Sequence, residues 1–342
     1  MTVPPGPLPH WMAPLSVPAS FAYGAISDAV LARRLARAQP LPRPTLSVGN
    51  LSAGGTGKSP IVRWIAAQLL QAGCRPVIVT RGYRRIPGGV GDETQEHRDA
   101  LPSVDVIEGV DRRAAVASFL ASGGACDCVV LDDAFQRRDI SRELDLVVVR
   151  ADDFTGHRLP RGWLRERPVA LRRASILACW ADEAELVRDG LQRIDCQREV
   201  LVLRRAWSGF RVSTGGIDAE QPLHHGSGLH AEIWLGVGRP DEFLAMAEGI
   251  GVPIGNVVRR RDHARYTANW VERQCARLHE RSVHAVLTSE KDWVKVRSVA
   301  AACASATAVS FVRPVLGVEA EEPQAVQRLL GPFTADVLGR RG

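Results

Sequence analysis

A glycine-rich segment near the start of the chain carries the strongest chemical signal in the sequence. A short apolar run ends at Asn50, and it leads into Ser52-Ala53-Gly54-Gly55-Thr56-Gly57-Lys58-Ser59. Glycines let successive backbone N–H groups converge on phosphate oxygens, and the amino end of a following helix adds partial positive charge. The pattern predicts that residues 53–59 bind the phosphates of a nucleotide, that Lys58 reaches the β- and γ-phosphates, and that the Ser59 hydroxyl binds Mg²⁺.

The rarity of lysine in this chain supports this interpretation of the loop. Only three of the 44 Lys and Arg residues are Lys, at positions 58, 291 and 295. In a chain that otherwise uses Arg, a Lys in this position indicates a role that Arg cannot fill. Ser52 stands where the common pattern G-x-x-x-x-G-K-[ST] has its first Gly, so the match to that pattern is imperfect.

A pair of carboxylates at the end of a second apolar run is the predicted metal site. Val129, Val130 and Leu131 lead directly into Asp132 and Asp133. P-loop proteins place their Mg²⁺-binding Asp at such a strand end. Alone, the pattern is equally typical of an ordinary strand end. Beside the glycine-rich loop, it predicts that Asp132 or Asp133 binds Mg²⁺ together with Ser59.

Four further polar residues lie in predicted loops or at a predicted helix start. Arg112 opens a helix, where a cation opposes the helix dipole, so a bound anion is its expected partner. Asp92 lies in the Gly-rich loop 87–92, Glu166 lies in the loop 162–168, and His263 lies in a polar turn before a helix. By residue type alone, these last three are equally typical of exposed turns.

Short β-branched runs alternate with helical stretches from residue 45 onward, and this alternation predicts the fold. Unalternated Val, Ile and Leu runs bounded by helices are typical of a parallel sheet covered on both faces. We therefore expect an α/β protein with a P-loop NTPase-like, doubly wound, mostly parallel sheet and a smaller second α/β domain. The expected strands of the first domain are 45–49, 76–80, 128–131, 144–149 and 174–179, and its expected helices are 60–72, 111–121 and 183–193.

We expect three segments along the chain. Residues 1–44 hold an apolar helix and a Pro-rich linker, residues 45–214 the P-loop core, and residues 215–342 the smaller domain. The helix is predicted from Pro18 to Leu35 and ends in an Arg cluster. Because prolines interrupt its start, it is predicted to associate with a membrane surface, and whether it lies on the bilayer or spans it stays open.

Composition excludes several classes of protein. Of the 342 residues, 45% are hydrophobic and 24% are charged, which excludes a disordered chain and a multi-pass membrane protein. The formal net charge of +6 favours anionic partners without choosing among them. The seven Cys form no C-x-x-C pair, so neither a zinc site nor a disulfide framework is predicted. No Lys or Arg precedes Arg33, so we expect no secretory signal and a chain that is cytosolic or faces the cytosol.

The order of eight short motifs resembles that of one kinase family. The motifs are Gly49-Asn50 with Gly54-Gly55-Thr56-Gly57-Lys58-Ser59-Pro60, Arg81-Gly82-Tyr83, Gly91-Asp92-Glu93, Asp132-Asp133-Ala134-Phe135-Gln136, Leu164-Arg165-Glu166, Gly236-Val237-Gly238-Arg239-Pro240, Asp262-His263 and Thr288-Ser289-Glu290-Lys291-Asp292. Together they resemble the tetraacyldisaccharide 4′-kinase (lipid A 4′-kinase) family from about Trp11 to Lys295. The family has no Gly at the position of Ser52, which accounts for the imperfect P-loop.

The resemblance implies a function and roles for several residues. It implies a membrane-associated kinase of the inner leaflet, with ATP and Mg²⁺ as cofactors, that phosphorylates the 4′-hydroxyl of a tetraacyldisaccharide 1-phosphate. Asp92 is implied as the general base, with His263 as its partner from the second domain. Arg112 is expected to contact a bound phosphate, and Glu166 is expected to lie near the metal or the sugar. Its implied partners are the lipid substrate and the membrane surface, with no nucleic acid and no obligate protein partner.

Two departures and two rival functions accompany this resemblance. The family motif D-D-G-[FL]-Q-H has Ala134 and Arg137 in place of its Gly and His, and Arg167 splits its L-R-E-P run. A P-loop GTPase or metallochaperone switch is the first rival, but residues 289–292 lack the Asn and the spacing of N-K-x-D. A nucleic-acid-binding ATPase is the second, but the arginines form no stripe interleaved with aromatic residues.

Overall fold

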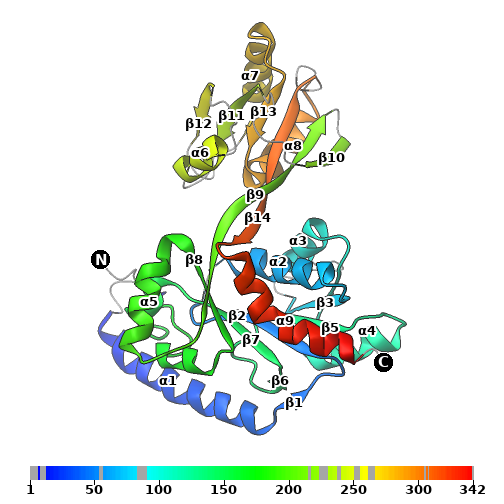
Figure 1. Ribbon diagram of the computed structural model, residues 1–342. Helices are drawn as coiled ribbons and strands as arrows, with labels where there is room; N and C mark the ends of the chain where they lie inside the picture. Colours follow the sequence, from blue (N-terminus) through cyan, green and yellow to red (C-terminus); the bar gives the residue numbers. More distant parts are fainter. Residues whose placement is uncertain are drawn as a thin grey trace. The chain divides into compact units, whose positions relative to one another are not determined.

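The chain folds into two compact units, and the computed structural model describes Pro7 and residues 13–53, 57–82, 91–214, 217–222, 230–236, 240–249, 255–260, 266–303, 306 and 308–340 (Figure 1). The first unit comprises residues 1–204 and 319–342, and the second comprises residues 205–318. The chain enters the second unit within β9 (Val200–Thr214) and leaves it within β14 (Ser310–Ala320). The division we expected, at residue 215 with all later residues in one domain, differs from these bounds.

The final helix accounts for part of this difference. α9 (Pro323–Gly339) buries four apolar side chains and belongs to the first unit. Just before it, the Glu321 N–H donates to the Val202 carbonyl at 2.9 Å, and within it Arg328 forms an ion pair with Glu199. Because these partners lie more than 100 residues earlier in the chain, a local sequence pattern does not reveal where α9 packs.

The sheet of the first unit is parallel, as predicted. Its strand order is β9-β8-β7-β2-β5-β3-β4, and each pair of neighbours in it runs parallel. The strands are β2 (Thr45–Asn50), β3 (Pro76–Thr80), β4 (Asp105–Glu108), β5 (Cys128–Asp132), β7 (Leu144–Val148) and β8 (Ile176–Trp180). Every residue of β2, β3, β5, β7 and β8 is buried, because both faces of the sheet are covered.

Helices cover both faces of this sheet, which confirms the doubly wound fold. α4 (Arg112–Ala121) buries Val116 among Val77, Val79, Val129 and Leu131. Side chains at alternate positions point to the opposite face, where α2 (Lys58–Gln71) contacts β2, β3 and β5 and buries five apolar residues of its own. α5 (Ala184–Arg193) packs its apolar face in a further core cluster with residues of β7 and β8.

Other elements of the first unit are short or lie outside this sheet. They are α1 (Ala13–Ala36), α3 (Asp92–Ala100), the paired β1 (Gln39–Pro40) and β6 (Ile140–Ser141), and the 3₁₀ helices η2 (Ala151–Phe154), η3 (Pro168–Arg173) and η4 (Ala181–Glu183). α1 begins at Ala13, five residues before its predicted start. α3 and β4 were not predicted, because neither carries the apolar periodicity that marks an amphipathic element.

The second unit is a smaller α/β fold, as predicted. Its strands follow the order β12-β11-β13-β14-β9, and β10 pairs antiparallel with β9. Its remaining elements are β10 (Ile217–Pro222), β11 (Ala231–Leu235), β12 (Val257–Arg259), β13 (Ala285–Thr288), α6 (Pro240–Gly249), α7 (Ala268–Glu280) and α8 (Glu290–Ala300). β9 is one continuous strand where two were expected on either side of Trp207. The buried Trp207 ring packs against Phe210 and Phe243.

Candidate active site

The candidate site lies at the carboxyl edge of the parallel sheet in the first unit. β2, β5 and β3 are neighbours in this sheet, and they end at Asn50, Asp132 and Thr80. The carboxyl ends of parallel strands form the edge at which α/β proteins bind their ligands. α2 also begins at this edge, so the predicted phosphate loop and the predicted metal carboxylates meet there.

The described end of the glycine-rich loop leads directly into α2. Gly57 precedes α2 with a φ of 77°, a left-handed conformation that favours glycine. Lys58 is the first residue of α2, and its Nζ lies 3.0 Å from Asn50 Oδ1 and 3.5 Å from Asp133 Oδ1. Gly54, Gly55 and Thr56 lie outside the described residues, so the predicted binding of phosphates by residues 53–59 stays a prediction.

The end of β2 is packed closely against the Asp-Asp motif. A Cβ atom on Gly49 would lie 2.6 Å from the Phe135 Cβ and 2.7 Å from the Phe135 backbone nitrogen. No side chain fits in that space, so Gly49 allows β2 and residue 135 to approach each other. Gln136 continues this contact, because its Nε2 donates to the Asn50 carbonyl at 3.0 Å.

Asp133 lies between two cations. Arg165 Nη1 is 2.9 Å from both carboxylate oxygens of Asp133, and Lys58 approaches Oδ1. Burial opposes ionisation, but Lys58 and Arg165 outweigh it and hold the pKa of Asp133 below its usual value. The sequence predicted Asp133 as a metal ligand. Arg165 was not among the predicted site residues, although it belongs to the Leu164-Arg165-Glu166 motif, and the fold brings it to Asp133 across 32 residues of the chain.

Asp132 has a different set of partners. Its Oδ2 accepts from His97 Nε2 at 3.1 Å, and both residues are buried. Its backbone carbonyl accepts from Arg112 Nη2 at 2.5 Å, and the same nitrogen lies 3.3 Å from the Asp133 carbonyl. Arg112 is only 1% exposed, and burial lowers its pKa to about 10. In this structure Arg112 fixes the end of β5, while the predicted phosphate contact stays a prediction.

Glu166 also belongs to a buried network at this edge. Its Oε1 accepts from Arg173 Nη2 at 2.7 Å and from Gln136 Nε2 at 3.1 Å. The chain beside it pairs with the loop entry, since the Arg165 N–H donates to the Leu51 carbonyl at 2.8 Å. The Leu164-Arg165-Glu166 motif is thus attached to both the glycine-rich loop and the Asp-Asp motif.

Ser52, the imperfect position of the loop pattern, contacts a buried acid. Burial raises the pKa of Asp153 to about 6, against the hydrogen bonds that the Arg150 backbone and the Ser52 side chain contribute. The Arg150 N–H donates to Asp153 Oδ2 at 2.9 Å. A Gly at position 52 would remove the side-chain partner of this carboxylate, which gives Ser52 a structural role.

The predicted base lies at the start of α3. Asp92 is the first residue of this helix, and its side chain lies outside what the structure describes. The preceding Gly91 N–H donates to Glu108 Oε2 at 2.9 Å. Burial and the nearby Asp132 and Asp133 raise the pKa of Glu93. His263 lies outside the described residues, so the predicted Asp92–His263 pair stays a prediction.

The donor set fits Mg²⁺ bound together with a nucleotide. Within the described residues, no group of three or more His, Cys, Asp or Glu side chains could hold a metal alone. Mg²⁺ usually keeps several waters and binds one or two protein carboxylates plus substrate phosphates. The Ser59 hydroxyl at the start of α2 and the Asp132 carboxylate at the end of β5 provide such a partial set. Asp133 already has both oxygens paired with cations.

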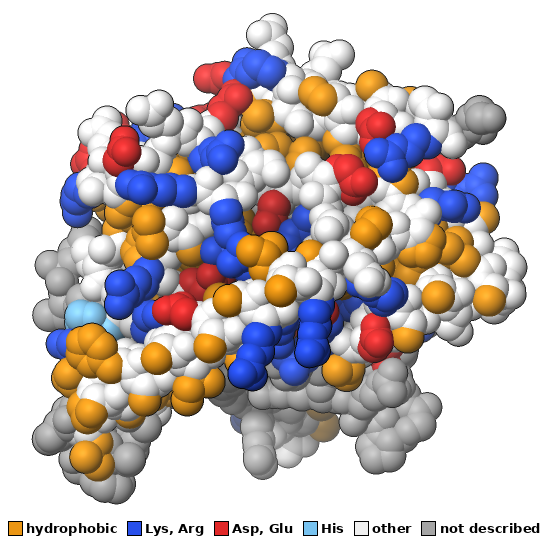
Figure 2. All heavy atoms as spheres, turned by 90° about the horizontal axis from the view of Figure 1, so that it is seen from below, with side chains coloured by type: hydrophobic (Ala, Val, Ile, Leu, Met, Phe, Trp, Pro, Cys, Tyr) orange, Lys and Arg blue, Asp and Glu red, His pale blue; other side chains and the backbone are white. Residues whose placement is uncertain are grey.

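α1 presents apolar side chains on the surface of the first unit. Phe21 is 71% exposed and Ile26 is 65% exposed, and Leu15, Val30 and Leu35 are also exposed. The stretch Leu15–Ala36 is long and apolar enough to cross a membrane by length and composition. Figure 2 views the face on which α1 lies, and hydrophobic and basic side chains gather there side by side.

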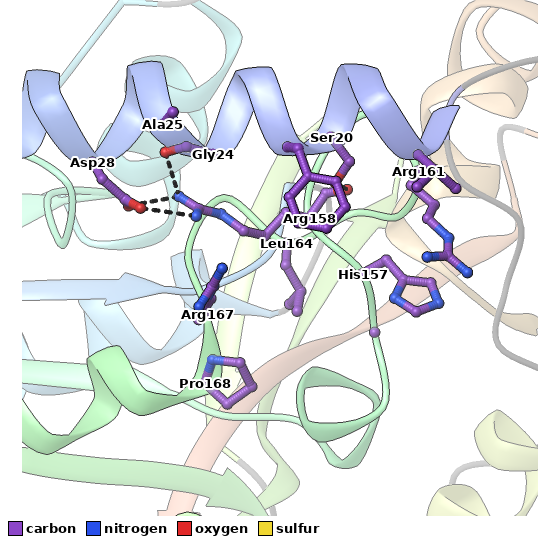
Figure 3. Close-up of a pocket in the computed structure, with 13 residues that line it drawn as sticks. Ser20, Gly24, Ala25, Asp28, His157, Arg158, Arg161, Leu164, Arg167 and Pro168 are labelled. Carbon is purple, nitrogen blue, oxygen red and sulfur yellow. Dashed lines mark hydrogen bonds and ion pairs between the residues drawn. The ribbon is translucent and has the colours of Figure 1, made fainter. Parts of the chain in front are cut away.

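A cavity of about 430 Å³ lies between α1 and the segment 156–168 (Figure 3). Arg158 rises from that segment to α1, where it pairs with Asp28 at 2.7 Å and donates to the Gly24 carbonyl at 3.2 Å. Arg161, Arg167 and His157 also line the cavity. The cavity therefore combines cationic side chains with an apolar helix, which suits a phosphorylated amphipathic molecule.

Comparison with known proteins identifies one family. Tetraacyldisaccharide-1-P 4′-kinase is the family that matches residues 12–332. A tetraacyldisaccharide 4′-kinase of Chlorobium phaeobacteroides is 32% identical over 287 residues, which cover 75% of this chain and 78% of the relative. The one of Anaeromyxobacter dehalogenans is 33% identical over 310 residues, which cover 83% and 80%. The crystal structure of the "apo" form of LpxK from Aquifex aeolicus, in complex with ATP, has the same fold. Its TM-score is 0.65 at 22% sequence identity, and the match covers 93% of this chain and 98% of that chain.

Proposed function

The chain belongs to the tetraacyldisaccharide-1-P 4′-kinase family, and from this we infer that it is a lipid kinase. It transfers the γ-phosphate of ATP to the 4′-hydroxyl of a tetraacyldisaccharide 1-phosphate and so forms lipid IVA, a step of lipid A biosynthesis. The observation that carries this inference is the family match over residues 12–332, which spans both units. The rival GTPase or metallochaperone function is not better supported by these comparisons.

The residues at the sheet edge are suited to phosphoryl transfer, which depends on positioning and charge neutralisation. We propose that the loop amides of residues 53–59 and the Lys58 ammonium hold the ATP phosphates. The Lys58 ammonium already lies beside two acceptors, Asn50 and Asp133. A phosphate that enters the site can replace them as the acceptor of the Lys58 hydrogen bonds. Mg²⁺, held by Ser59 and Asp132 or Asp133, supplies charge neutralisation at the phosphates when bound.

We propose that Asp92 accepts the proton of the attacking 4′-hydroxyl. The oxygen of the 4′-hydroxyl then bonds to the γ-phosphorus, while the bond between the γ-phosphorus and the ADP oxygen breaks. His263 is the proposed partner that orients Asp92. The position of Asp92 supports its role, because it begins the helix whose Glu93 carboxylate is close enough to Asp132 and Asp133 for their charge to raise its pKa. Arg112 and Glu166 contribute by fixing the Asp-Asp motif and the loop 162–168.

The membrane-facing part of the proposal rests on α1. Burying an apolar side chain such as Phe21 stabilises association by about 1.5–3 kcal/mol. Arg33, an exposed residue in the last turn of α1, adds about 1 kcal/mol near anionic lipid. We propose that α1 binds the cytoplasmic face of the inner membrane and that the cavity beside it receives the phosphorylated sugar of the substrate.

A direct assay tests this function. Labelled ATP, Mg²⁺ and tetraacyldisaccharide 1-phosphate in detergent micelles are expected to yield a labelled bis-phosphorylated lipid. Lys58→Ala should lower this rate by about 10²-fold or more, since one preorganised donor to the transferred group contributes that much. Arg63→Ala is the matched control, because Arg63 lies five residues later on α2 and pairs with the exposed Glu96. GTP hydrolysis without lipid labelling would overturn the proposal.

A further inference from the structure

α3 is held in the first unit by polar side chains. Its nine residues are Asp-Glu-Thr-Gln-Glu-His-Arg-Asp-Ala, and among those whose side chains the structure describes, Thr94 and His97 are fully buried. Thr94 Oγ1 lies 2.7 Å from Thr80 Oγ1 and donates to Glu108 Oε2 at 3.0 Å. His97 bonds to Asp132 instead. The two buried residues therefore bond to different partners, one of which is a proposed metal ligand.

The buried environment of His97 destabilises the folded state if the only role of this side chain is to attach α3 to the sheet. A carboxylate can only accept, so His97 Nε2–H donates to Asp132 Oδ2. The other ring nitrogen, Nδ1, is buried and has no hydrogen-bond partner. Leaving a buried polar atom unpaired destabilises the folded state. An apolar side chain at this position would pack α3 without that cost, so the bond to Asp132 needs a further reason.

The two aspartates of the motif differ in how they are held. Both oxygens of Asp133 are paired with cations. Asp132 is fixed at its carbonyl by Arg112 and at one carboxylate oxygen by His97. Among the described residues, none bonds to the remaining oxygen, Oδ1. This is the arrangement of a carboxylate that is oriented through one oxygen and binds through the other.

We propose that His97 is a positioning residue for Mg²⁺, which holds the Asp132 carboxylate so that Oδ1 binds the metal of the Mg²⁺–ATP complex. The proposal rests on the kinase function inferred above and deepens it, because it selects Asp132 over Asp133 as the direct ligand. Partners that orient a metal-binding carboxylate typically contribute 10- to 100-fold to metal affinity. The contribution of His97 is expected within this range.

The test measures how nucleotide binding to the full-length protein depends on Mg²⁺. His97→Leu removes the N–H, and a fluorescent ATP analogue titrated at increasing Mg²⁺ should need about tenfold more metal for half-maximal binding. Binding of the same analogue in EDTA should stay unchanged. His97→Gln places an amide N–H at a similar reach and should return the Mg²⁺ requirement to within about threefold of the wild-type value.

Thr94→Val is the matched control on the same helix. It removes a buried hydroxyl that also attaches α3 to the sheet, but not one that bonds to Asp132. Its melting temperature should fall while its Mg²⁺ requirement stays at the wild-type value. If His97→Leu loses thermal stability with an unchanged Mg²⁺ requirement, His97 serves docking alone and the proposal is wrong. If His97→Leu does not fold, comparison of His97→Gln with the shorter His97→Asn decides, since only Asn should raise the requirement.

Asp132→Asn separates this proposal from the proposed function. If Asp132→Asn raises the Mg²⁺ requirement and His97→Leu does not, the positioning role fails while the metal site stands. If neither variant changes the requirement and the wild-type protein labels no lipid, the kinase function itself fails. A raised requirement in both variants, with rescue by His97→Gln, supports the positioning role.

Discussion

α1 and α3 both depart from the usual burial pattern of a surface helix, one by exposing apolar side chains and the other by burying polar ones. A surface helix normally buries an apolar stripe and exposes its polar side chains. α1 exposes Phe21 and Ile26, whereas α3 buries Thr94 and His97. Each reversal lies beside a proposed ligand, the membrane lipid for α1 and the Mg²⁺–ATP complex for α3. The comparison indicates that these two helices are shaped by what they bind as much as by the core.

Both helices are nevertheless attached by polar contacts. α1 is held by Arg158, which bonds to Asp28 and the Gly24 carbonyl, and by Arg34, which donates to the Gln136 carbonyl at 3.0 Å. α3 is held by the buried hydroxyl and imidazole described above. The difference therefore lies in the outer face of each helix, which is apolar in α1 and charged in α3.

The largest expected effect tests the amino end of α3. Asp92→Ala should lower kcat by about 10²–10⁴-fold, the usual contribution of a positioned base, with little change in the KM for ATP. Steady-state kinetics with the lipid substrate measures both constants. Glu96→Ala, on an exposed position of the same helix, should keep wild-type kinetics. An intact kcat with a large rise in KM would instead make Asp92 a nucleotide ligand.

The next effect tests whether a buried acid beside the loop destabilises the fold. The pKa of Asp153 is raised from 3.8 to about 6 in the folded protein, so the folded state holds this proton between those values and the unfolded state does not. Stability therefore falls as the pH rises from about 4 to about 6. Asp153→Asn should remove roughly 3 kcal/mol of this pH dependence, as followed by urea unfolding.

A neighbouring residue controls for this change. Asp152 lies one position earlier in η2, and its side chain is 56% exposed. Asp152→Asn should leave the slope of stability against pH at the wild-type value. An equal slope in Asp153→Asn and wild type would show that Asp153 does not hold its proton.

A smaller effect tests the apolar face of α1. Phe21→Glu replaces a 71% exposed ring with a charge, and binding to vesicles that contain anionic lipid should fall by about tenfold. Vesicle sedimentation measures the bound fraction. Leu186→Glu changes an apolar residue that is 44% exposed on α5 and should leave binding unchanged. An equal loss of vesicle binding in both variants would show that α1 contributes no more to membrane binding than the rest of the surface.

The smallest effect tests the attachment of α1. Arg158→Met keeps an apolar stem but removes the bonds to Asp28 and Gly24. We expect a loss of about 1 kcal/mol, measured as faster amide exchange in α1 with unchanged exchange in β2 and β5. Unchanged exchange in α1 would mean that its other contacts suffice.

Sequence patterns predicted the parts of this molecule that are local. The strand, glycine loop and Lys58 follow one another directly, and the strand leading to Asp132 is a continuous apolar run, so both were predicted. α3 was not predicted, because its only apolar residue is Ala100. His97 and Arg165 lie 35 and 32 residues from the aspartates that they bond to, and only the fold brings them together.

The return of the chain to the first unit through α9 has a consequence for synthesis of the protein. A ribosome must complete all of residues 205–318 before Glu319 and the final helix emerge. Leu330, Phe333 and Val337 then become buried on a unit whose first strand was made almost 300 residues earlier. The unit that begins first is therefore finished last, and a premature stop after residue 318 would leave a whole second unit attached to an unfinished first one that contains the phosphate loop.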